Sequence, residues 1–184
     1  MRYDVVRPDV DETPQPDESP AMLAARLATS KAEAASLLLD SKPSEPALYP
    51  PSNGALIIGS DQVASIEGQL LGKPGNFENA CNQLARMSGR TAEFYTALTI
   101  LDTVSCERFT ALDVTRVTLR PLDDSEIKRY VQHDNPLDCA GSFKMESLGI
   151  SLFESIETKD PTALIGLPML SVCKGLRHFG VQLP

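Results

Sequence analysis

The sequence predicts a single α/β domain over residues 1–184, with a mixed, twisted sheet flanked by helices. Three observations predict this class. The length of 184 residues fits one compact domain with room for a hydrophobic core. Short apolar runs typical of buried strands alternate along the chain with helical patterns. Two β-rich stretches follow one another directly, which favours antiparallel strands inserted between the alternating units.

The composition is that of an ordinary globular protein. Hydrophobic residues make up 42% of the chain, charged residues make up 23%, and the formal net charge is -8. This charge argues against a DNA or RNA polymer as partner, because polymer binding needs many cations on one face. No apolar run approaches the ~20 residues of a membrane span, and the start resembles no secretion signal. We therefore expect a cytoplasmic protein without a membrane partner.

The first third of the chain predicts one strand, one helix and one insertion. Residues 3–6 form a short β-prone stretch that ends before Pro8. Residues 21–40 predict a helix. Its expected apolar stripe consists of Leu23, Leu27, Ala34 and Leu38. Residues 41–53 contain four prolines, which predicts an extended, mobile insertion.

The middle of the chain predicts a buried strand, a hairpin and a second helix. The run 55–59 is wholly apolar up to its glycine and should end as a strand at Ser60 and Asp61. Residues 63–71 read as a hairpin that turns at Glu67 and Gly68. Residues 77–87 read as a helix closed by a Ser-Gly pair.

The remainder predicts an antiparallel strand pair at 92–101 and 108–119. A helix over 123–133 follows, with acidic residues in its first turn, where they suit the helix dipole. Residues 150–153 are expected to form a strand. A final helix over 168–179 begins with proline, which is favoured at the first helical position.

Two groups of acidic residues are candidates for chemistry. Asp61 follows the buried strand, and ligands of open α/β sheets lie at the carboxyl ends of strands. The alternative for Asp61 is a helix cap or a turn. Asp9, Asp11 and Glu12 form the second group, and carboxylate oxygens without histidine or thiolate suit Mg²⁺ or Mn²⁺. The alternative for this group is a solvated acidic loop.

Two lysines complete a candidate phosphate site. Lys31 lies at the edge of the apolar stripe of its helix and points into a cleft or snorkels to solvent. Lys73 lies between Gly72 and Pro74, in a rigid turn that suits a phosphate-binding point charge. Taken alone, each is more typical of an ordinary surface lysine, and only the combination with the carboxylates favours a phosphate site. The stretch 140–142, beside Lys144 and Glu146, predicts either a glycine-hinged loop over a ligand or a plain turn.

The order of short motifs along the whole chain resembles that of Maf proteins, which have a Maf/ITPase-like fold. These motifs are Val10-Asp11-Glu12, Ser30-Lys31-Ala32, Gly59-Ser60-Asp61-Gln62, Gly72-Lys73-Pro74, Ser88-Gly89-Arg90, Tyr95-Thr96, Glu126-Ile127 with Tyr130, Ala140-Gly141-Ser142 and Gly166-Leu167-Pro168. Gly-Ser-Asp-Gln, Cys-Ala-Gly-Ser-Phe-Lys and Leu152-Phe153-Glu154 resemble the branch that hydrolyses 7-methyl-GTP. Other branches usually carry Thr where Gln62 stands.

The resemblance implies hydrolysis of a nucleoside triphosphate to the monophosphate and diphosphate, with Mg²⁺ or Mn²⁺ as cofactor. Asp61 matches the proton acceptor that activates the attacking water, and it is also expected at the metal. Glu12 matches a metal-associated carboxylate. Lys31 and Lys73 match lysines that contact the triphosphate, where charge neutralisation assists attack at phosphorus.

The resemblance also implies how the base is chosen. Gln62 and Glu146 match positions tied to base selection, and a carboxylate suits 7-methylguanine because the methylated base is positively charged. A homodimer is a family-level expectation. Family members carry a Ser-x-Ser-x-Arg loop before the strand at which this chain begins. Without it, we expect each lost phosphate contact of ~1.5–3 kcal/mol to reduce affinity by about one to two decades.

Two alternatives differ from the 7-methyl-GTP hypothesis. The chain is a non-catalytic nucleotide-binding or cell-division-associated protein, as the family's septum-inhibitor name suggests, or it is a pyrophosphatase of the family that acts on dTTP or UTP. The missing loop motivates the first alternative. Turnover of dTTP or UTP without turnover of 7-methyl-GTP would favour the second.

Overall fold

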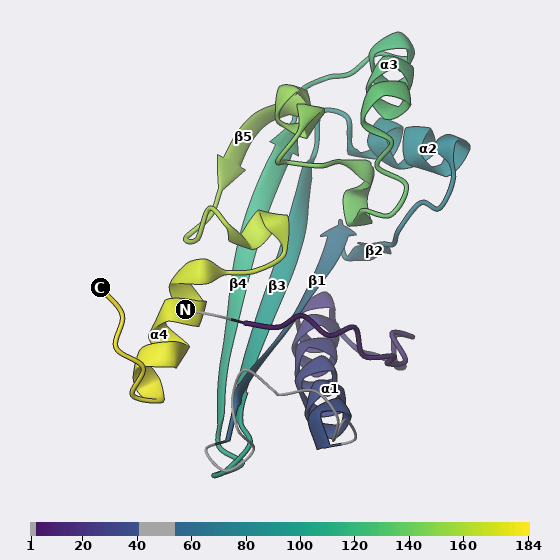
Figure 1. The fold of residues 1–184 in the computed structure, drawn as a ribbon. Coiled ribbons are helices and arrows are strands. Elements are labelled where there is room, and N and C mark those ends of the chain that lie inside the picture. Colours follow the sequence, from purple (N-terminus) through teal and green to yellow (C-terminus); the bar gives the residue numbers. More distant parts are fainter. Residues whose placement is uncertain (1–2, 41–53) are drawn as a thin grey trace.

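The computed structural model describes residues 3–40 and 54–184, which build one five-stranded sheet with helices on both faces (Figure 1). The strand order is β2-β1-β3-β4-β5. The predicted α/β class with flanking helices is confirmed. The four strand pairings are all antiparallel, where a mixed sheet was expected. The predicted Pro-rich insertion at 41–53 lies outside the described residues.

Two hairpins make up most of the sheet, and they pair with each other through their longest strands. The strands are β1 (Leu56–Ile66), β2 (Gln69–Leu71), β3 (Thr91–Asp102), β4 (Arg108–Leu119) and β5 (Phe153–Glu157). Both predicted hairpins are confirmed: β1 turns into β2 at Glu67 and Gly68, which both have positive φ, and β3 pairs with β4 along its length.

The edge of β1 is only partly covered. The short strand β2 pairs with Ala64–Ile66, at the end of β1, and β3 pairs along the other side. Among the described residues, Leu56 to Val63 therefore have a partner strand on one side alone. This open stretch of backbone is where the candidate site lies.

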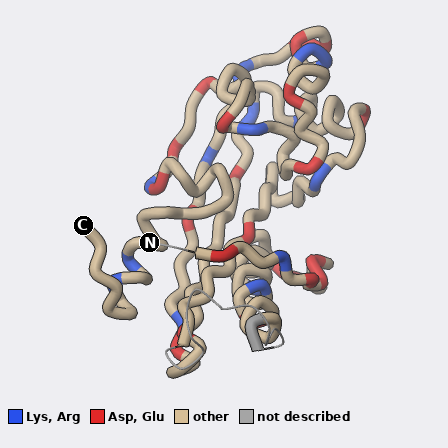
Figure 2. Tube along the Cα trace, in the orientation of Figure 1, with Lys and Arg blue, Asp and Glu red and all other residues tan. Residues whose placement is uncertain are grey.

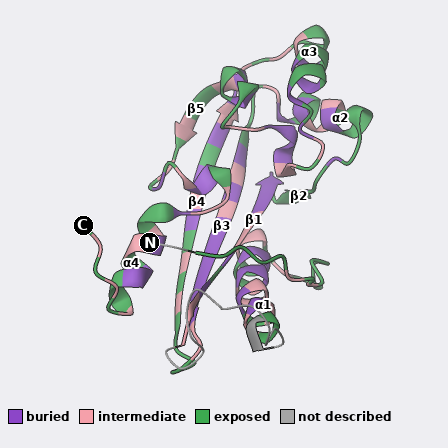
Figure 3. Cartoon of the chain, in the orientation of Figure 1, coloured by how far each residue is buried: buried purple, intermediate pink, exposed green. Residues whose placement is uncertain are grey.

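The helices divide between the two faces of the sheet. They are α1 (Pro20–Asp40), α2 (Phe77–Met87), α3 (Asp124–Asp134) and α4 (Met169–His178), with short 3₁₀ helices η2 (Ala140–Ser142), η3 (Leu148–Leu152) and η4 (Ala163–Ile165). Successive strand residues point to opposite faces. Ala97 of β3 accordingly packs against α1, whereas Phe94 packs in the core beneath α2 and α3, and Leu98 packs beneath α4. Buried residues gather on β1, β3, β4 and the helix faces turned toward them (Figure 3).

The helix at 21–40 is confirmed, but its buried stripe differs from the predicted one. Leu23 and Leu27 are buried as expected, whereas Ala34 is half-buried and Leu38 is 39% exposed. The buried positions toward the end of the helix are Ala28, Ala32 and Ala35. Small residues replace leucine there because the helix approaches the sheet closely, as described below.

Two predicted strands are wrong. Residues 3–6 are extended without a partner strand in the described part of the chain, and Tyr3 and Val5 are 77% and 78% exposed. A β-prone stretch becomes a strand only where it pairs and packs, so propensity alone misleads here. Residues 150–152 lie in the 3₁₀ helix η3, and the strand begins at Phe153, where pairing with Leu119 becomes available.

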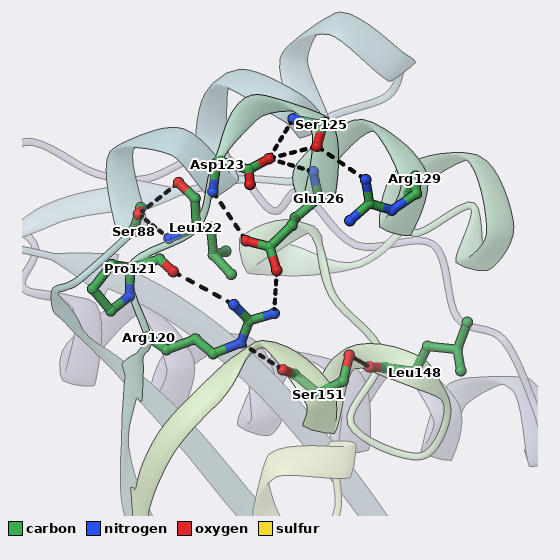
Figure 4. A network of polar contacts seen from close by, with 10 residues as sticks. All are labelled: Ser88, Arg120, Pro121, Leu122, Asp123, Ser125, Glu126, Arg129, Leu148 and Ser151. Atoms are coloured by element: carbon green, nitrogen blue, oxygen red, sulfur yellow. Dashed lines mark hydrogen bonds and ion pairs between the residues drawn. The ribbon is translucent and has the colours of Figure 1, made fainter.

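The start of α3 is fixed by a polar network (Figure 4). Asp123 and Glu126 form a capping box, in which each side chain accepts a hydrogen bond from the other residue's backbone N–H. Arg120, at the end of β4, pairs with Glu126 at 2.9 Å and donates to the carbonyl of Ser151 at 3.0 Å. These contacts join α3 to the sheet and to η3.

Charges are spread over the chain. Acidic and basic residues both occur along the trace, without a continuous basic stripe on the drawn face (Figure 2). None of the described helices combines the length and the apolar character needed to cross a membrane.

Candidate active site

A close contact between α1 and β1 builds the centre of the site. A Cβ atom on Gly59 would lie 2.3 Å from the carbonyl oxygen of Ala28 and 2.9 Å from the Cβ of Ala32. Only glycine permits this approach. Asp61 lies two residues beyond Gly59 on the same face of the strand, so the tight contact places it beside Lys31 of α1.

Lys31 joins two carboxylates that are far apart in the sequence. Its Nζ lies 2.5 Å from Oδ1 of Asp61 and 2.8 Å from Oε1 of Glu12. Lys73 extends the network, with its Nζ 3.8 Å from Oε2 of Glu12. Side-chain exposure rises from 10% at Asp61 through 24% at Lys31 and 47% at Glu12 to 65% at Lys73. The network thus leads from a buried carboxylate to solvent.

The N-terminal segment carries Glu12 to this place because Arg26 of α1 anchors it. The Nε of Arg26 lies 2.7 Å from Oε1 of Glu18, and its Nη2 donates to Oε2 of Glu18 and to the carbonyl of Thr13. A two-pronged contact of this kind fixes geometry as well as charge. The segment from Asp11 to Glu18 is therefore held along α1, with Glu12 facing Lys31.

The burial of the network changes its proton affinities. Burial raises the pKa of Asp61, and the hydrogen bond from Lys31 only partly opposes this. Burial lowers the pKa of Lys31, but hydrogen bonds to Asp61 and Glu12 outweigh it, so that the net shift is upward. The hydrogen bond from Lys31 lowers the pKa of Glu12. A carboxyl group with a raised pKa is a better proton acceptor than an exposed one.

The position of Asp61 corrects the sequence-based expectation. It does not follow the strand but lies within β1, opposite Ala97 of β3, and it is neither a helix cap nor a turn residue. Asp61 and Gln62 are consecutive, so their side chains leave opposite faces of the sheet. Both reach one pocket because none of the strands that the structure describes covers the edge of β1 at this level.

Gln62 is held tightly on its own face. Its Nε2 donates to Oγ1 of Thr96 at 3.0 Å and to the carbonyls of Ala163 and Leu164 at 2.9 and 3.2 Å. Carbonyl oxygens only accept hydrogen bonds, so the orientation of the amide follows from its partners. Ser60 also joins β1 to this segment, by donating to the carbonyl of Gly166 at 2.8 Å. The η4 segment is thereby fixed beside the strand.

The pocket has a volume of about 310 Å³ and brings together residues from six separate segments. Its lining consists of Lys31, Ser60, Asp61, Gln62, Lys73, Phe94, Asp138, Cys139, Ala140, Phe143, Met145, Glu146, Leu164, Ile165 and Gly166. Five of the six predicted site residues are in this set. The sixth, Glu12, meets the pocket through its ion pairs with Lys31 and Lys73. The two lysines and Asp61 supply charged groups that suit a phosphate chain, and the other lining residues include both apolar and polar side chains.

The stretch 140–142 lines the pocket through Ala140 rather than forming a remote turn. Gly141 has φ +76°, and a Cβ there would lie 2.9 Å from Cζ of Phe94. Phe94 and Phe143 pack with ring centroids 5.1 Å apart. The sequence reasoning missed both rings and Asp138. Phe143 lies inside a quoted motif, which was a usable signal, whereas Phe94 is one apolar residue of a strand.

The donors for a divalent cation are two carboxylates. Among residues 3–40 and 54–184, no three His, Cys, Asp or Glu side chains gather around a common point. Glu12 and Asp61 nevertheless converge on one cation already, the ammonium group of Lys31. One or two carboxylates completed by water and substrate phosphates form a usual Mg²⁺ site, so these residues fit the expected metal.

Comparison with known proteins identifies the family. The sequence model of the family described as "Maf-like protein" matches residues 1–179. The chain belongs to the Maf family. The arrangement of Maf motifs noted in the sequence is thereby confirmed over nearly the whole chain.

Several curated proteins are similar to this chain over 99–100% of its length. A protein of Xanthomonas axonopodis pv. citri (strain 306) named "7-methyl-GTP pyrophosphatase" is 50% identical over 185 residues, covering 100% of this chain and 89% of its own length. A protein of Xanthomonas oryzae pv. oryzae (strain MAFF 311018) with the same name is 48% identical, with the same coverage. A third, from Bordetella pertussis (strain Tohama I / ATCC BAA-589 / NCTC 13251), is 46% identical over 182 residues, 99% of this chain and 84% of its own length.

Proposed function

We propose that this protein hydrolyses 7-methyl-GTP to 7-methyl-GMP and diphosphate and so removes a modified nucleotide from the pool. One observation carries the proposal: the largely buried carboxylate of Asp61, two lysines and the two predicted base-selecting residues all line one pocket. Relatives at 46–50% identity bear the name of this activity. Neither the dTTP and UTP alternative nor the non-catalytic alternative has comparable support.

The roles of the residues follow from their positions. Asp61 accepts a proton from the attacking water, since its buried carboxyl group has a raised pKa. Lys31 keeps the carboxylate oriented and, with Lys73, places positive charge beside the triphosphate. Gln62 and Glu146 face the base from the other side of the β1 edge. A carboxylate at position 146 favours a base that carries positive charge.

We further propose that Glu12 and Asp61 hold Mg²⁺ or Mn²⁺ together with substrate oxygens. When bound, such an ion neutralises phosphate charge and polarises the reacting phosphorus. With the two carboxylates engaged by the ion, the ammonium group of Lys31, which now contacts both of them, would be available to bind phosphate oxygens of the substrate. The homodimer and the cytoplasmic location stay predictions.

Diphosphate release from 7-methyl-GTP, GTP, dTTP and UTP tests the proposed function. With Mg²⁺ or Mn²⁺ present, we expect selective turnover of 7-methyl-GTP. Asp61→Asn keeps the shape of the side chain and should reduce kcat by about 10²–10⁴-fold, the usual contribution of a general base. Asp4→Asn, at an exposed position outside the pocket, is the matched control and should be fully active. Turnover confined to dTTP or UTP would contradict the proposed substrate.

A further inference from the structure

Glu146 lies in a loop that is held in place by contacts of the residues on either side of it. The side chain is exposed, and no hydrogen bond or ion pair is described for it within residues 3–40 and 54–184. Two nearby residues contact the end of α3: Lys144, two positions before Glu146, and Ser147, one position after it. The described polar contacts that hold the Glu146 stretch therefore run through these flanking residues, in addition to the packing of Met145 against the core.

Lys144 binds the carboxyl-terminal end of α3 at three points. Its Nζ donates to the carbonyls of Asp134 and Asn135 at 3.0 and 3.2 Å, and its backbone N–H donates to the hydroxyl of Tyr130 at 3.0 Å. The last carbonyls of a helix lack partners within the helix and carry negative partial charge. An ammonium group therefore binds them well. The ammonium group of Lys144 donates its described hydrogen bonds to the helix end, and Lys144 does not line the pocket.

Ser147 closes the other side of the loop. Its hydroxyl donates to Oδ1 of Asp134 at 2.5 Å, and Asp134 Oδ2 is buried without a hydrogen-bond partner among the described residues. The N–H of Gly149 donates to the carbonyl of Lys144 at 3.0 Å, and a Cβ on Gly149 would lie 2.3 Å from that oxygen. The turn containing Glu146 is thus tight and tied at both ends.

The helix that receives these contacts is itself well held. At its other end the capping box and the Arg120–Glu126 ion pair join α3 to β4 and η3 (Figure 4). Burial and the neighbouring Asp134 carboxylate raise the pKa of Tyr130, so its hydroxyl stays protonated at neutral pH. The end of α3 is accordingly a fixed support for the loop.

We propose that Lys144 is a positioning residue that, with Tyr130 and Ser147, fixes Glu146 against the end of α3 and thereby sets the preference for a cationic base. This inference rests on the proposed function, because the preference concerns 7-methyl-GTP over GTP. Lys144 acts through Glu146 and does not touch the substrate.

A direct electrostatic effect of Lys144 predicts the opposite result. Its charge acts on Asp138 and Cys139, which both line the pocket, so it lies close enough to repel a positively charged base. If this repulsion dominated, removal of the charge would strengthen binding of 7-methyl-GTP. If Lys144 positions Glu146, its removal weakens that binding. The sign of the change therefore decides between the two effects.

The test compares Lys144→Met with wild type in kcat and KM for both nucleotides. Methionine keeps most of the side-chain length but removes the charge and the donors. We expect KM for 7-methyl-GTP to rise about tenfold, the scale of one lost charge-assisted contact, with kcat and the KM for GTP changed less than about twofold. Lys144→Arg retains donors and charge and should restore most of the preference. Lys128→Met, at an exposed lysine of α3 outside the pocket, is the charge-matched control.

Two further measurements separate the possible failures. The single variant Glu146→Gln should lose the preference for 7-methyl-GTP over GTP. If the wild-type protein itself shows no such preference, the proposed function is refuted rather than the inference about Lys144. Amide hydrogen exchange over residues 139–149 should speed up in Lys144→Met and in the milder Ser147→Ala, whatever the substrate. Unchanged exchange, or an unchanged or increased preference for 7-methyl-GTP in Lys144→Met, would overturn the positioning role.

Discussion

At the scale of single residues, Asp61 is the position where burial and pairing oppose each other. Burial raises its pKa, and the ammonium group of Lys31 lowers it by a smaller amount. A raised pKa means that the carboxyl group takes up a proton at a higher pH than an exposed aspartate, for which the ordinary value is about 3.9. The base form, which the proposed reaction needs, is thus lost earlier on acidification.

The pH dependence of kcat/KM for 7-methyl-GTP should reflect this balance. As pH falls through the raised pKa of Asp61, we expect activity to decline with the uptake of one proton. Lys31→Met removes the cation that lowers this pKa, so the decline should move to higher pH, in addition to a lower maximal rate. The pH profiles of wild type and variant provide the measurement. A shift toward lower pH in the variant would show that Lys31 does not stabilise the Asp61 carboxylate.

The contribution of Asp61 to folding stability changes with pH in the direction opposite to that of a typical aspartate. Because the folded state raises the pKa of Asp61, it binds this proton more tightly than the unfolded state does. The stabilisation from this proton is present below the unfolded pKa and is lost as pH rises through the folded pKa. Asp61→Asn should therefore impair activity at neutral pH without a comparable loss of stability.

Individual site residues were predictable from sequence only where a motif marked them. Asp61, Lys31 and Lys73 were singled out from their local surroundings, and the structure places all three in one pocket. Gln62, Glu146 and the role of Glu12 came from the family resemblance. Phe94 and Phe143 were not predicted, because their contact joins residues 49 positions apart and depends on the fold.

At the scale of elements, the close contact between α1 and β1 is the feature on which the site depends. Gly59 allows the helix backbone to approach the strand, and buried alanines of α1 replace larger side chains. If the helix moved outward, Lys31 would lose its position beside Asp61.

Gly59→Ala should therefore affect stability and activity together. The added methyl group meets backbone atoms that cannot easily move, and overpacking of this kind costs about 1–3 kcal/mol in the free energy of unfolding. Urea unfolding and 7-methyl-GTP turnover provide the two measurements. Gly72→Ala is the matched control, because nothing lies within 4 Å of a Cβ at that glycine and its φ is not positive. Equal stability of both variants would contradict the close approach.

Elements with strong local signals were predicted correctly, and elements that depend on distant partners were not. The helices at 77–87 and 123–133 have clear caps, and the turn at Glu67 and Gly68 marks its hairpin. Residues 3–6 have strand-like side chains, but none of the described strands lies beside them. The strand predicted at 150–153 begins only at Phe153, because η3 occupies the preceding residues. Pairing is a property of the whole sheet and leaves little trace in a short segment.

At the scale of the whole molecule, charge separates a small anionic substrate from a polymeric one. The formal net charge is -8, whereas the pocket presents Lys31 and Lys73 locally. A mononucleotide needs only the few local cations, whereas the net negative charge of the whole chain repels a long polyanion.

Single-stranded DNA should consequently not inhibit turnover of 7-methyl-GTP, even at a phosphate concentration equal to that of an inhibiting mononucleotide. Initial rates with excess divalent metal, with oligonucleotide or with GTP as competitor, provide the measurement. Saturable inhibition by the oligonucleotide that weakens steeply with added salt would contradict this prediction.

At the open edge of β1, the neighbouring residues Asp61 and Gln62 contact different parts of the structure. Asp61 and Gln62 leave opposite faces of the strand, and in the proposed function the first serves cleavage of the phosphate chain and the second serves selection of the base. A substitution at Gln62 or Glu146 accordingly alters one wall without entering the packing around Asp61 and Lys31. Selectivity for the base can therefore evolve, or be redesigned, independently of the cleavage chemistry.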